Sequence, residues 1–348
     1  MYKVQVPINC CNIGDVLADD VYNDRGAKLV RKNTIINQYI KDKLIEMGIS
    51  TVWTYQSVNT PHSQAKDVNY EIIKENYHVV VLTIKEVLNK LASGEQIEYD
   101  KIVDISKLIF STVNESRSVI RFLAEIRNTD EYTYTHCVDT AFYSMLIAKW
   151  LKLSENQIQE VIQAGLLHDI GKVRIPNEIL NKKGKLTVEE FEVIKKHSLY
   201  GYELIKDIYD FGDSVKNGVL MHHERLDGSG YPYGIRGDAI DLYAKIIAVA
   251  DVYDAMTRDR VYKKKATPFE VFQMFSTTGL GTFDTIVLNS FLNNMPVFYI
   301  GSNVELNNGE VGEIVYIPPQ DIASPIVRVD RRYYDLSNMH ELRVLSIL

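Results

Sequence analysis

The spacing of apolar residues divides the chain into a long helical middle and two shorter ends. From about residue 102 to residue 275, apolar residues recur every three or four positions, which is the period of a helix with one buried face. One such stripe leads directly into His168. Another fills most of residues 243–256, where Asp251 and Asp254 are the only acidic residues. The pattern predicts a bundle of helices.

The two ends show strand and turn patterns instead. Residues 24–26 (Asp-Arg-Gly) predict a turn between two short apolar segments, and Thr34 is a candidate cap for a helix that ends at Gly48. Near the other end, residues 307–309 (Asn-Asn-Gly) separate two segments of β character, which is a strong hairpin signal. The fold class is therefore mainly α, with small β-rich amino- and carboxy-terminal modules.

These changes of pattern predict four segments along the chain. A polar stretch from Gln56 to Asp67 indicates a linker, after which the helical period begins. We expect an amino-terminal module of β-strands and a helix at 1–56, a linker and helical connector at 57–115, a helical domain at 116–295, and a small β module at 296–348.

Composition narrows the class of protein without naming an activity. The chain has 348 residues, 46% of them hydrophobic and 24% charged, as in a globular protein of two or three domains. Its net charge of −7 provides no basic surface for duplex nucleic acid. Three cysteines form no disulfide framework, and no apolar run is long enough to span a membrane. We expect a cytoplasmic protein without a signal peptide or a membrane partner.

Histidines are concentrated in the helical middle of the chain. A single histidine on a helix is usually a core or surface residue, but here five of the eight lie at the ends or buried faces of successive helices. Asp169 follows one of them directly, and Asp251 in its apolar helix would be a costly buried charge unless a cation neutralised it. The pattern indicates a metal site. The five histidines are His136, His168, His197, His222 and His223.

An adjacent His-Asp pair suits a site with two metal ions, because the carboxylate can bridge them while the imidazole binds one. Two divalent ions roughly 3.5–4 Å apart lower the pKa of a bridging water and clamp a phosphate, which indicates a metal-dependent hydrolase. Lys172 lies four residues after His168 and can stabilise charge on a phosphate oxygen. Arg260 and Lys263 are further candidate cations for an anionic ligand, whereas Lys264 and Lys265 are expected to be solvated.

A glycine-rich loop follows the His-His pair. Alone, residues 228–232 (Gly-Ser-Gly-Tyr-Pro) would be a surface loop, but directly after His222, His223 and Glu224 they indicate a wall of the site, with Tyr231 available to stack on a base.

Together these motifs resemble the HD-GYP family, a branch of the HD-domain phosphohydrolases of bacteria. The matching stretches are Thr133 to Ala141, His168 to Thr187, the isolated His197, His222 to Ile240, and Ala248 to Thr267. The resemblance implies an all-helical HD-type bundle. It also implies a metal-dependent phosphodiesterase that hydrolyses cyclic di-GMP to the linear dinucleotide pGpG and, in some members, on to GMP.

The resemblance also implies roles for single residues. The first ion would bind His136, His168, Asp169 and Asp251, and the second would bind Asp169, His197, His222 and His223. Lys172 matches the catalytic lysine, which acts together with Asp169. Arg260 and Lys263 match the phosphate-contacting cations. The signature tripeptide is Gly230, Tyr231 and Pro232.

This sequence departs from the family pattern at a few positions. Tyr132 stands where members with a third metal have a glutamate, and Glu131 is one position away, so we expect two divalent ions per chain, with iron or manganese favoured. Val261 replaces a common proline. The expected partner is cyclic di-GMP, and a homodimer is an option that the sequence leaves open.

Two other functions compete with this one. The metal residues alone would equally fit an HD phosphohydrolase acting on another nucleotide. A non-catalytic receptor for a cyclic dinucleotide is the third reading, although such receptors usually lose metal ligands and the full two-metal set is present here.

Overall fold

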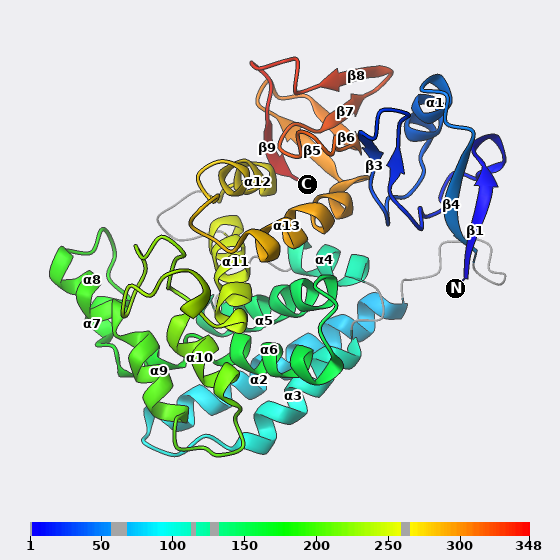
Figure 1. Ribbon diagram of the computed structural model, residues 1–348. Helices are drawn as coiled ribbons and strands as arrows, with labels where there is room; N and C mark the ends of the chain where they lie inside the picture. Colours follow the sequence, from blue (N-terminus) through cyan, green and yellow to red (C-terminus); the bar gives the residue numbers. More distant parts are fainter. Residues whose placement is uncertain (1, 57–67, 113–115, 126–131, 259–264) are drawn as a thin grey trace. The chain divides into compact units, whose positions relative to one another are not determined.

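The computed structural model describes residues 2–56, 68–112, 116–125, 132–258 and 265–348 (Figure 1). As predicted, the fold is mainly α, with small sheets near the two ends of the chain. The chain divides into two compact units, which are described separately. The helical unit comprises Lys66–Ala266 and Phe275–Ser290, and the β-rich unit comprises Met1–Ala65, Thr267–Met274 and Phe291–Leu348.

Helices joined by short loops make up the described part of the helical unit. The α-helices are α2 (Val68–Ala92), α3 (Tyr99–Thr112), α4 (Ser116–Glu125), α5 (Tyr132–Trp150), α6 (Glu155–Leu167), α7 (Asn177–Leu180), α8 (Val188–Lys195), α9 (His197–Ile205), α10 (Asp213–Met221) and α11 (Leu242–Thr257). Two short 3₁₀ helices are η2 (Ile170–Arg174) and η3 (Gly237–Ala239). Helices α12 (Pro268–Ser276) and α13 (Thr285–Asn294) each extend across the division between the units.

Helix α5 is the central element of this unit. It packs against α2, α6 and α11, and its residues from Val138 to Ala148 are buried on every side (Figure 1). A helix that is buried on every side belongs in a core rather than at a surface. Helices α5 and α6 also approach closely, because a Cβ added at Gly165 would lie 2.9 Å from the Cα of Ala141. Side chains that lie between α5, α6 and α11 are therefore held at fixed distances from one another by the packing of these helices.

A second close approach joins η2 to α9. A Cβ on Gly171 would lie 1.9 Å from the carbonyl oxygen of His197 and 2.4 Å from the backbone nitrogen of Gly201. Only glycine lets the two backbones meet at this distance. The contact fixes the turn that carries Asp169 beside the start of α9.

The amino-terminal part of the β-rich unit contains two small antiparallel sheets and one helix. The elements are β1 (Tyr2–Pro7) paired with β4 (Thr51–Gln56), β2 (Val21–Tyr22) paired with β3 (Lys28–Val30), the 3₁₀ helix η1 (Ile8–Cys10), and α1 (Gln38–Glu46). The predicted turn at 24–26 is confirmed. So is the end of the helix at Gly48, which adopts a φ of +76°.

The prediction that Thr34 caps this helix was wrong. The N-cap is Asn37, whose side-chain oxygen accepts a hydrogen bond of 2.8 Å from the backbone nitrogen of Ile40. Thr34 instead lies in an extended segment, where its carbonyl accepts a hydrogen bond from the backbone nitrogen of Leu17. Pairing with this neighbouring segment delays the start of the helix by three residues.

The carboxy-terminal part forms a five-stranded antiparallel sheet with the order β8-β7-β6-β5-β9. Its elements are η4 (Pro296–Tyr299), β5 (Asn303–Leu306), β6 (Val311–Tyr316), β7 (Ile326–Val329), β8 (Arg332–Asp335) and β9 (Val344–Ile347). The predicted hairpin at residues 307–309 is confirmed, with a φ of +85° at Gly309. Strand β8 was missed because its residues are mostly polar and lie at the edge of the sheet.

The two ends of the chain pack together within the β-rich unit. Asn37 donates a hydrogen bond of 2.6 Å to the carbonyl oxygen of Val315, and the Tyr316 hydroxyl donates to the carbonyl oxygen of Leu29. Arg31 reaches the carbonyl oxygen of Leu292 at 2.6 Å. The four sequence boundaries given above stay a prediction.

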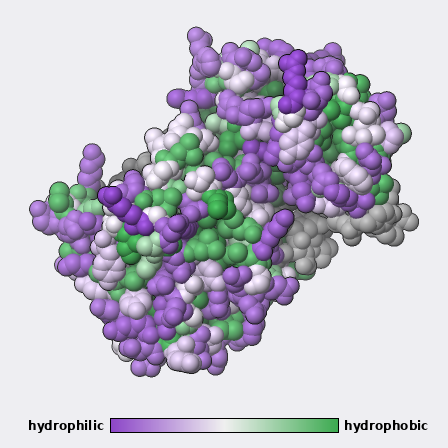
Figure 2. Space-filling model, viewed as in Figure 1, coloured by the Kyte–Doolittle hydropathy of each residue, from purple (hydrophilic) through white to green (hydrophobic). Residues whose placement is uncertain are grey.

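Hydrophilic residues cover most of the face shown in Figure 2, and hydrophobic residues gather there in smaller patches. Within the described ranges, no helix combines the length and the apolar character needed to cross a membrane.

The close approach at Gly171 leads to a first prediction. Gly171→Ala should lower the thermal unfolding midpoint, because backbone cannot move aside cheaply, and overpacking typically costs about 1–3 kcal/mol. Gly212→Ala is the control, since its added Cβ would find its nearest atom at 3.6 Å, an ordinary contact. Equal unfolding midpoints for the two variants would show that η2 and α9 are not held together as described.

Candidate metal centre

The seven side chains predicted as metal ligands come from five parts of the helical unit. His136 lies near the start of α5 and Asp251 lies within α11, while the others stand at helix ends. His168 follows α6, Asp169 precedes η2, His197 begins α9, and His222 and His223 follow α10. Helix ends allow side chains from several helices to converge on one point.

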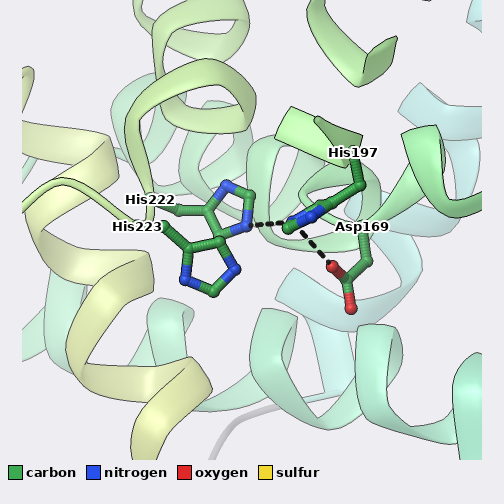
Figure 3. Close-up of side chains that lie close together, drawn as sticks. All are labelled: Asp169, His197, His222 and His223. Atoms are coloured by element: carbon green, nitrogen blue, oxygen red, sulfur yellow. Dashed lines mark hydrogen bonds and ion pairs between the residues drawn. The ribbon is translucent and has the colours of Figure 1, made fainter. Parts of the chain in front are cut away.

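The structure brings all seven side chains together in two groups. One group contains Asp169, His197, His222 and His223 (Figure 3), and the other contains His136, His168 and Asp251. Within each group, the potential ligand atoms lie within 4.8 Å of one another. All seven are buried except His223, whose side chain is 19% exposed.

Asp169 lies between the two groups. Its Oδ1 is 3.3 Å from the Nε2 of His197, and its Oδ2 is 3.4 Å from the Nε2 of His168 and 3.7 Å from the Nε2 of His136. One carboxylate oxygen thus faces each group. This is the geometry that a bridging carboxylate needs, and the bridging role stays a prediction.

Three of the histidines are oriented by the backbone. Their Nδ1 atoms lie 2.7–2.8 Å from the carbonyl oxygen three residues earlier in the chain. A carbonyl can only accept, so each Nδ1 carries a proton, and in the neutral ring the Nε2 presents a lone pair to the centre. The pairs are His168 with Gly165, His197 with Ile194, and His222 with Val219.

This arrangement leaves Nε2 lone pairs that accept no hydrogen bond. The Nε2 atoms of His197 and His222 face each other at 3.2 Å (Figure 3), and burial lowers the pKa of both imidazoles, which keeps them neutral. The Nε2 of His168 is fully buried and has no hydrogen-bond partner among the described residues. Buried polar atoms of this kind cost free energy unless something binds them. A cation between the rings would satisfy them, so the residues present fit a metal ion.

The carboxylates supply the charge that such an ion requires. Burial acts to raise the pKa of Asp169, but Lys172 and His168 hold it well below its usual range. Burial likewise acts to raise the pKa of Asp251, but the hydrogen bond with His136 holds this pKa well below its usual range. Two ionised carboxylates with mostly neutral imidazoles form a donor set suited to divalent transition metals. The cluster could therefore bind metal.

Asp254, the second acidic residue of α11, also contacts the cluster, which the sequence pattern did not predict. Its Oδ2 accepts a hydrogen bond of 2.7 Å from the Nδ1 of His136, whose Nε2 is 3.1 Å from the Oδ1 of Asp251. Burial acts to lower the pKa of His136, but these two carboxylates raise it to about 10. In the metal-free protein His136 therefore carries both protons, and a metal binding at its Nε2 would displace one of them. The signal was its position three residues after Asp251, which places both acids on one face of α11.

Lys172 lies at the edge of the centre, and its side chain is 25% exposed. Its ammonium bonds to the Oδ2 of Asp169. This position lets the ammonium contact both the metal-binding carboxylate and an anion arriving from solvent.

The signature loop forms one wall of the centre. The ring of Tyr231 stacks on His223 with centroids 4.5 Å apart, and a Cβ on Gly230 would lie 2.4 Å from the carbonyl oxygen of His223. Pro232 follows through a cis peptide bond. Buried Glu224 accepts hydrogen bonds from the backbone nitrogens of residues 233 and 235, which closes the loop around its carboxylate. The importance of Glu224 was missed, since its partners are backbone groups.

Some predicted residues lie outside the part of the chain that the structure describes. These are Arg260 and Lys263, the predicted phosphate contacts, together with Glu131 and the side chain of Tyr132, on which the absence of a third metal was argued.

Comparisons with known proteins identify relatives of this chain. The HD domain family model matches residues 118–286. A cyclic di-GMP phosphodiesterase of Pseudomonas aeruginosa is 35% identical over 236 residues, which cover 68% of this chain and 57% of that protein. A 3'3'-cGAMP-specific phosphodiesterase of Vibrio cholerae is 36% identical over 190 residues, covering 54% and 44% respectively. The chain spans about half the length of the curated relatives that it matches most strongly.

One solved structure shows the same fold. It is an HDG"Y"P protein from Bdellovibrio bacteriovorus, with a TM-score of 0.55 and 16% sequence identity, and the match covers 84% of this chain and 99% of that one.

The position of Asp169 between the two groups leads to a prediction about metal content. Asp169→Ala should lose metal from both groups, and Asp251→Ala should lose it mainly from the group with His136. Metal analysis of the purified proteins measures this directly. Asp238→Ala is a control, because the Asp238 side chain is fully exposed. Native metal content in Asp169→Ala would remove the bridging role assigned to this residue.

Proposed function

Because residues 118–286 belong to the HD domain family, we propose that the chain is a metal-dependent phosphodiesterase that hydrolyses cyclic di-GMP to the linear dinucleotide pGpG. The observation that carries the proposal is the pair of ligand groups that meet at Asp169, with Lys172 and the signature loop beside them. Curated relatives named cyclic di-GMP phosphodiesterases support the choice of substrate.

We assign two metal ions to the two groups. His136, His168, Asp169 and Asp251 would hold the first, and Asp169, His197, His222 and His223 would hold the second. A pair of bound divalent ions supplies a water of lowered pKa and neutralises charge on the phosphate. Iron or manganese suits this mixture of imidazole and carboxylate ligands.

The protein side chains orient the substrate and stabilise charge. Lys172 contacts Asp169 at the edge of the centre, and its ammonium would stabilise the phosphate oxygen on which charge develops. Tyr231 offers a ring face to a guanine base. Arg260 and Lys263 provide cations for the second phosphate, which a small ester lacks.

A second substrate is favoured by one specific observation. A relative that is 36% identical is named for 3'3'-cGAMP, a cyclic dinucleotide with one adenine in place of a guanine. The residues assigned above would bind metal, phosphate and a base face, and a base face is common to both purines. Side-by-side rates on cyclic di-GMP and 3'3'-cGAMP test the choice, and product formation over many turnovers distinguishes an enzyme from a receptor. A faster rate on 3'3'-cGAMP would show that this dinucleotide, and not cyclic di-GMP, is the preferred substrate.

Lys172 leads to a prediction about rate. Lys172→Ala should lower kcat by about 10²–10³-fold, the range for removing one preorganised electrostatic donor, while metal content stays native. Steady-state kinetics on cyclic di-GMP together with metal analysis measure both quantities. Lys185→Ala is the control, because Lys185 is exposed. Loss of metal in Lys172→Ala would make its role structural.

The cations that follow α11 lead to a prediction about substrate size. Arg260→Ala and Lys263→Ala should reduce kcat/KM for cyclic di-GMP far more than for a small chromogenic phosphodiester, because binding energy from the remote phosphate orients the scissile one. Comparing the two substrates with each variant measures the difference. Equal losses of kcat/KM on both substrates would show that these cations do not bind the dinucleotide. Equal native efficiency on both would favour an HD hydrolase acting on other esters.

A further inference from the structure

A buried polar chain lies behind His136 and reaches a helix outside the family match. Helix α2 ends at Ala92, whereas the HD domain match begins at residue 118. Even so, the hydroxyl of Tyr77 in α2 donates a hydrogen bond of 2.7 Å to the Oδ1 of Asp139 in α5. The other oxygen of Asp139 accepts from the guanidinium of Arg258, directly after α11.

Arg258 continues the chain to the metal centre. Its Nε lies 2.7 Å from the Oδ2 of Asp254, and its Nη1 donates a hydrogen bond of 2.7 Å to the hydroxyl of Thr135. Asp254 in turn accepts from the Nδ1 of His136. The sequence of contacts is therefore Tyr77, Asp139, Arg258, Asp254 and His136, and each of the five is at most 3% exposed.

The charges along this chain depend on one another. Burial acts to lower the pKa of Arg258, but Asp139 and Asp254 raise it above its ordinary value, so the guanidinium stays charged and is shared between two carboxylates. Without the charge of Asp139, Arg258 would pair more strongly with Asp254. Asp254 would then be a weaker acceptor for the proton on His136, and the imidazole would be a poorer metal ligand.

We propose that Tyr77, Asp139 and Arg258 are positioning residues for the metal centre, acting through Asp254 on His136. Helix α2 is then part of the centre, although it lies in the segment that the sequence predicted to be a connector. The inference rests on the proposed metal centre. It adds three residues, from three different elements, that tune one of the two metal positions and leave the other unchanged.

The test is a titration of the metal-free 348-residue chain with cobalt(II) alone, followed by visible absorbance. Tyr77→Phe and Asp139→Asn should each weaken one of the two binding steps by about 10-fold, the lower end for loss of a partner behind a metal ligand. The weakened step should be the one that His136→Ala removes, and the step that His197→Ala removes should be native.

Tyr243→Phe is the matched control. Tyr243 lies on α11, is 4% exposed, and donates a hydrogen bond of 2.6 Å from its hydroxyl to the carboxylate of Glu160. The control loses the same kind of bond at a site away from His136, so it measures the effect of stability alone. If Asp139→Asn fails to fold, Tyr77→Phe, which removes a single oxygen atom, decides the outcome.

Two results would overturn the inference. One is native cobalt affinity in Tyr77→Phe with a fall in thermal stability like that of Tyr243→Phe. The other is equal weakening of both binding steps, which would indicate general loosening of the unit. If the unmodified protein takes up no cobalt, the metal centre itself is wrong, and that failure is distinct from the other two.

Discussion

The helical unit is organised around buried histidine nitrogens whose lone pairs have no hydrogen-bond donor among the described residues facing them. Backbone carbonyls accept hydrogen bonds from the Nδ1 atoms of His168, His197 and His222, and so every Nε2 on these rings points inward. Two of these atoms face each other at 3.2 Å. Protonation would relieve the contact, but burial and neighbouring histidines lower the pKa of His222 well below its usual range. A divalent cation would satisfy the lone pairs and the carboxylates together, so the cluster could bind metal.

The same constraint accounts for features further from the centre. Ligands can converge only if backbones approach closely, and Gly171 and Gly230 stand where a Cβ would strike the backbone beside His197 and His223. Buried charges around the centre must also be paired, because an unpaired buried ion is costly. Arg258 provides this balance between Asp139 and Asp254. Packing and charge are thus both set by the requirement to gather ligands at one point.

Much of this could be predicted from the sequence, because the signals are local. The helical period located α5, α6 and α11, the Asn-Gly pair located the hairpin before β6, and adjacent ligand residues marked the centre. The rest depends on partners distant in the chain. Tyr77 and Asp139 are 62 positions apart, and Thr135 and Arg258 are 123 apart, so no local pattern connects them. Thr34 and Asn37 are both good helix caps, and only the pairing of residue 34 with Leu17 decides between them. Strand β8 carries no apolar alternation and was missed for that reason.

The central claim is that Asp169 joins two metal positions in one centre. Anomalous diffraction from crystals of this 348-residue chain, recorded at the iron and manganese edges, tests it most directly. The account predicts two peaks, both within bonding distance of the carboxylate of Asp169, one beside His136 and His168 and the other beside His197 and His222. A single peak on one side of Asp169, or peaks that do not contact this carboxylate, would contradict it.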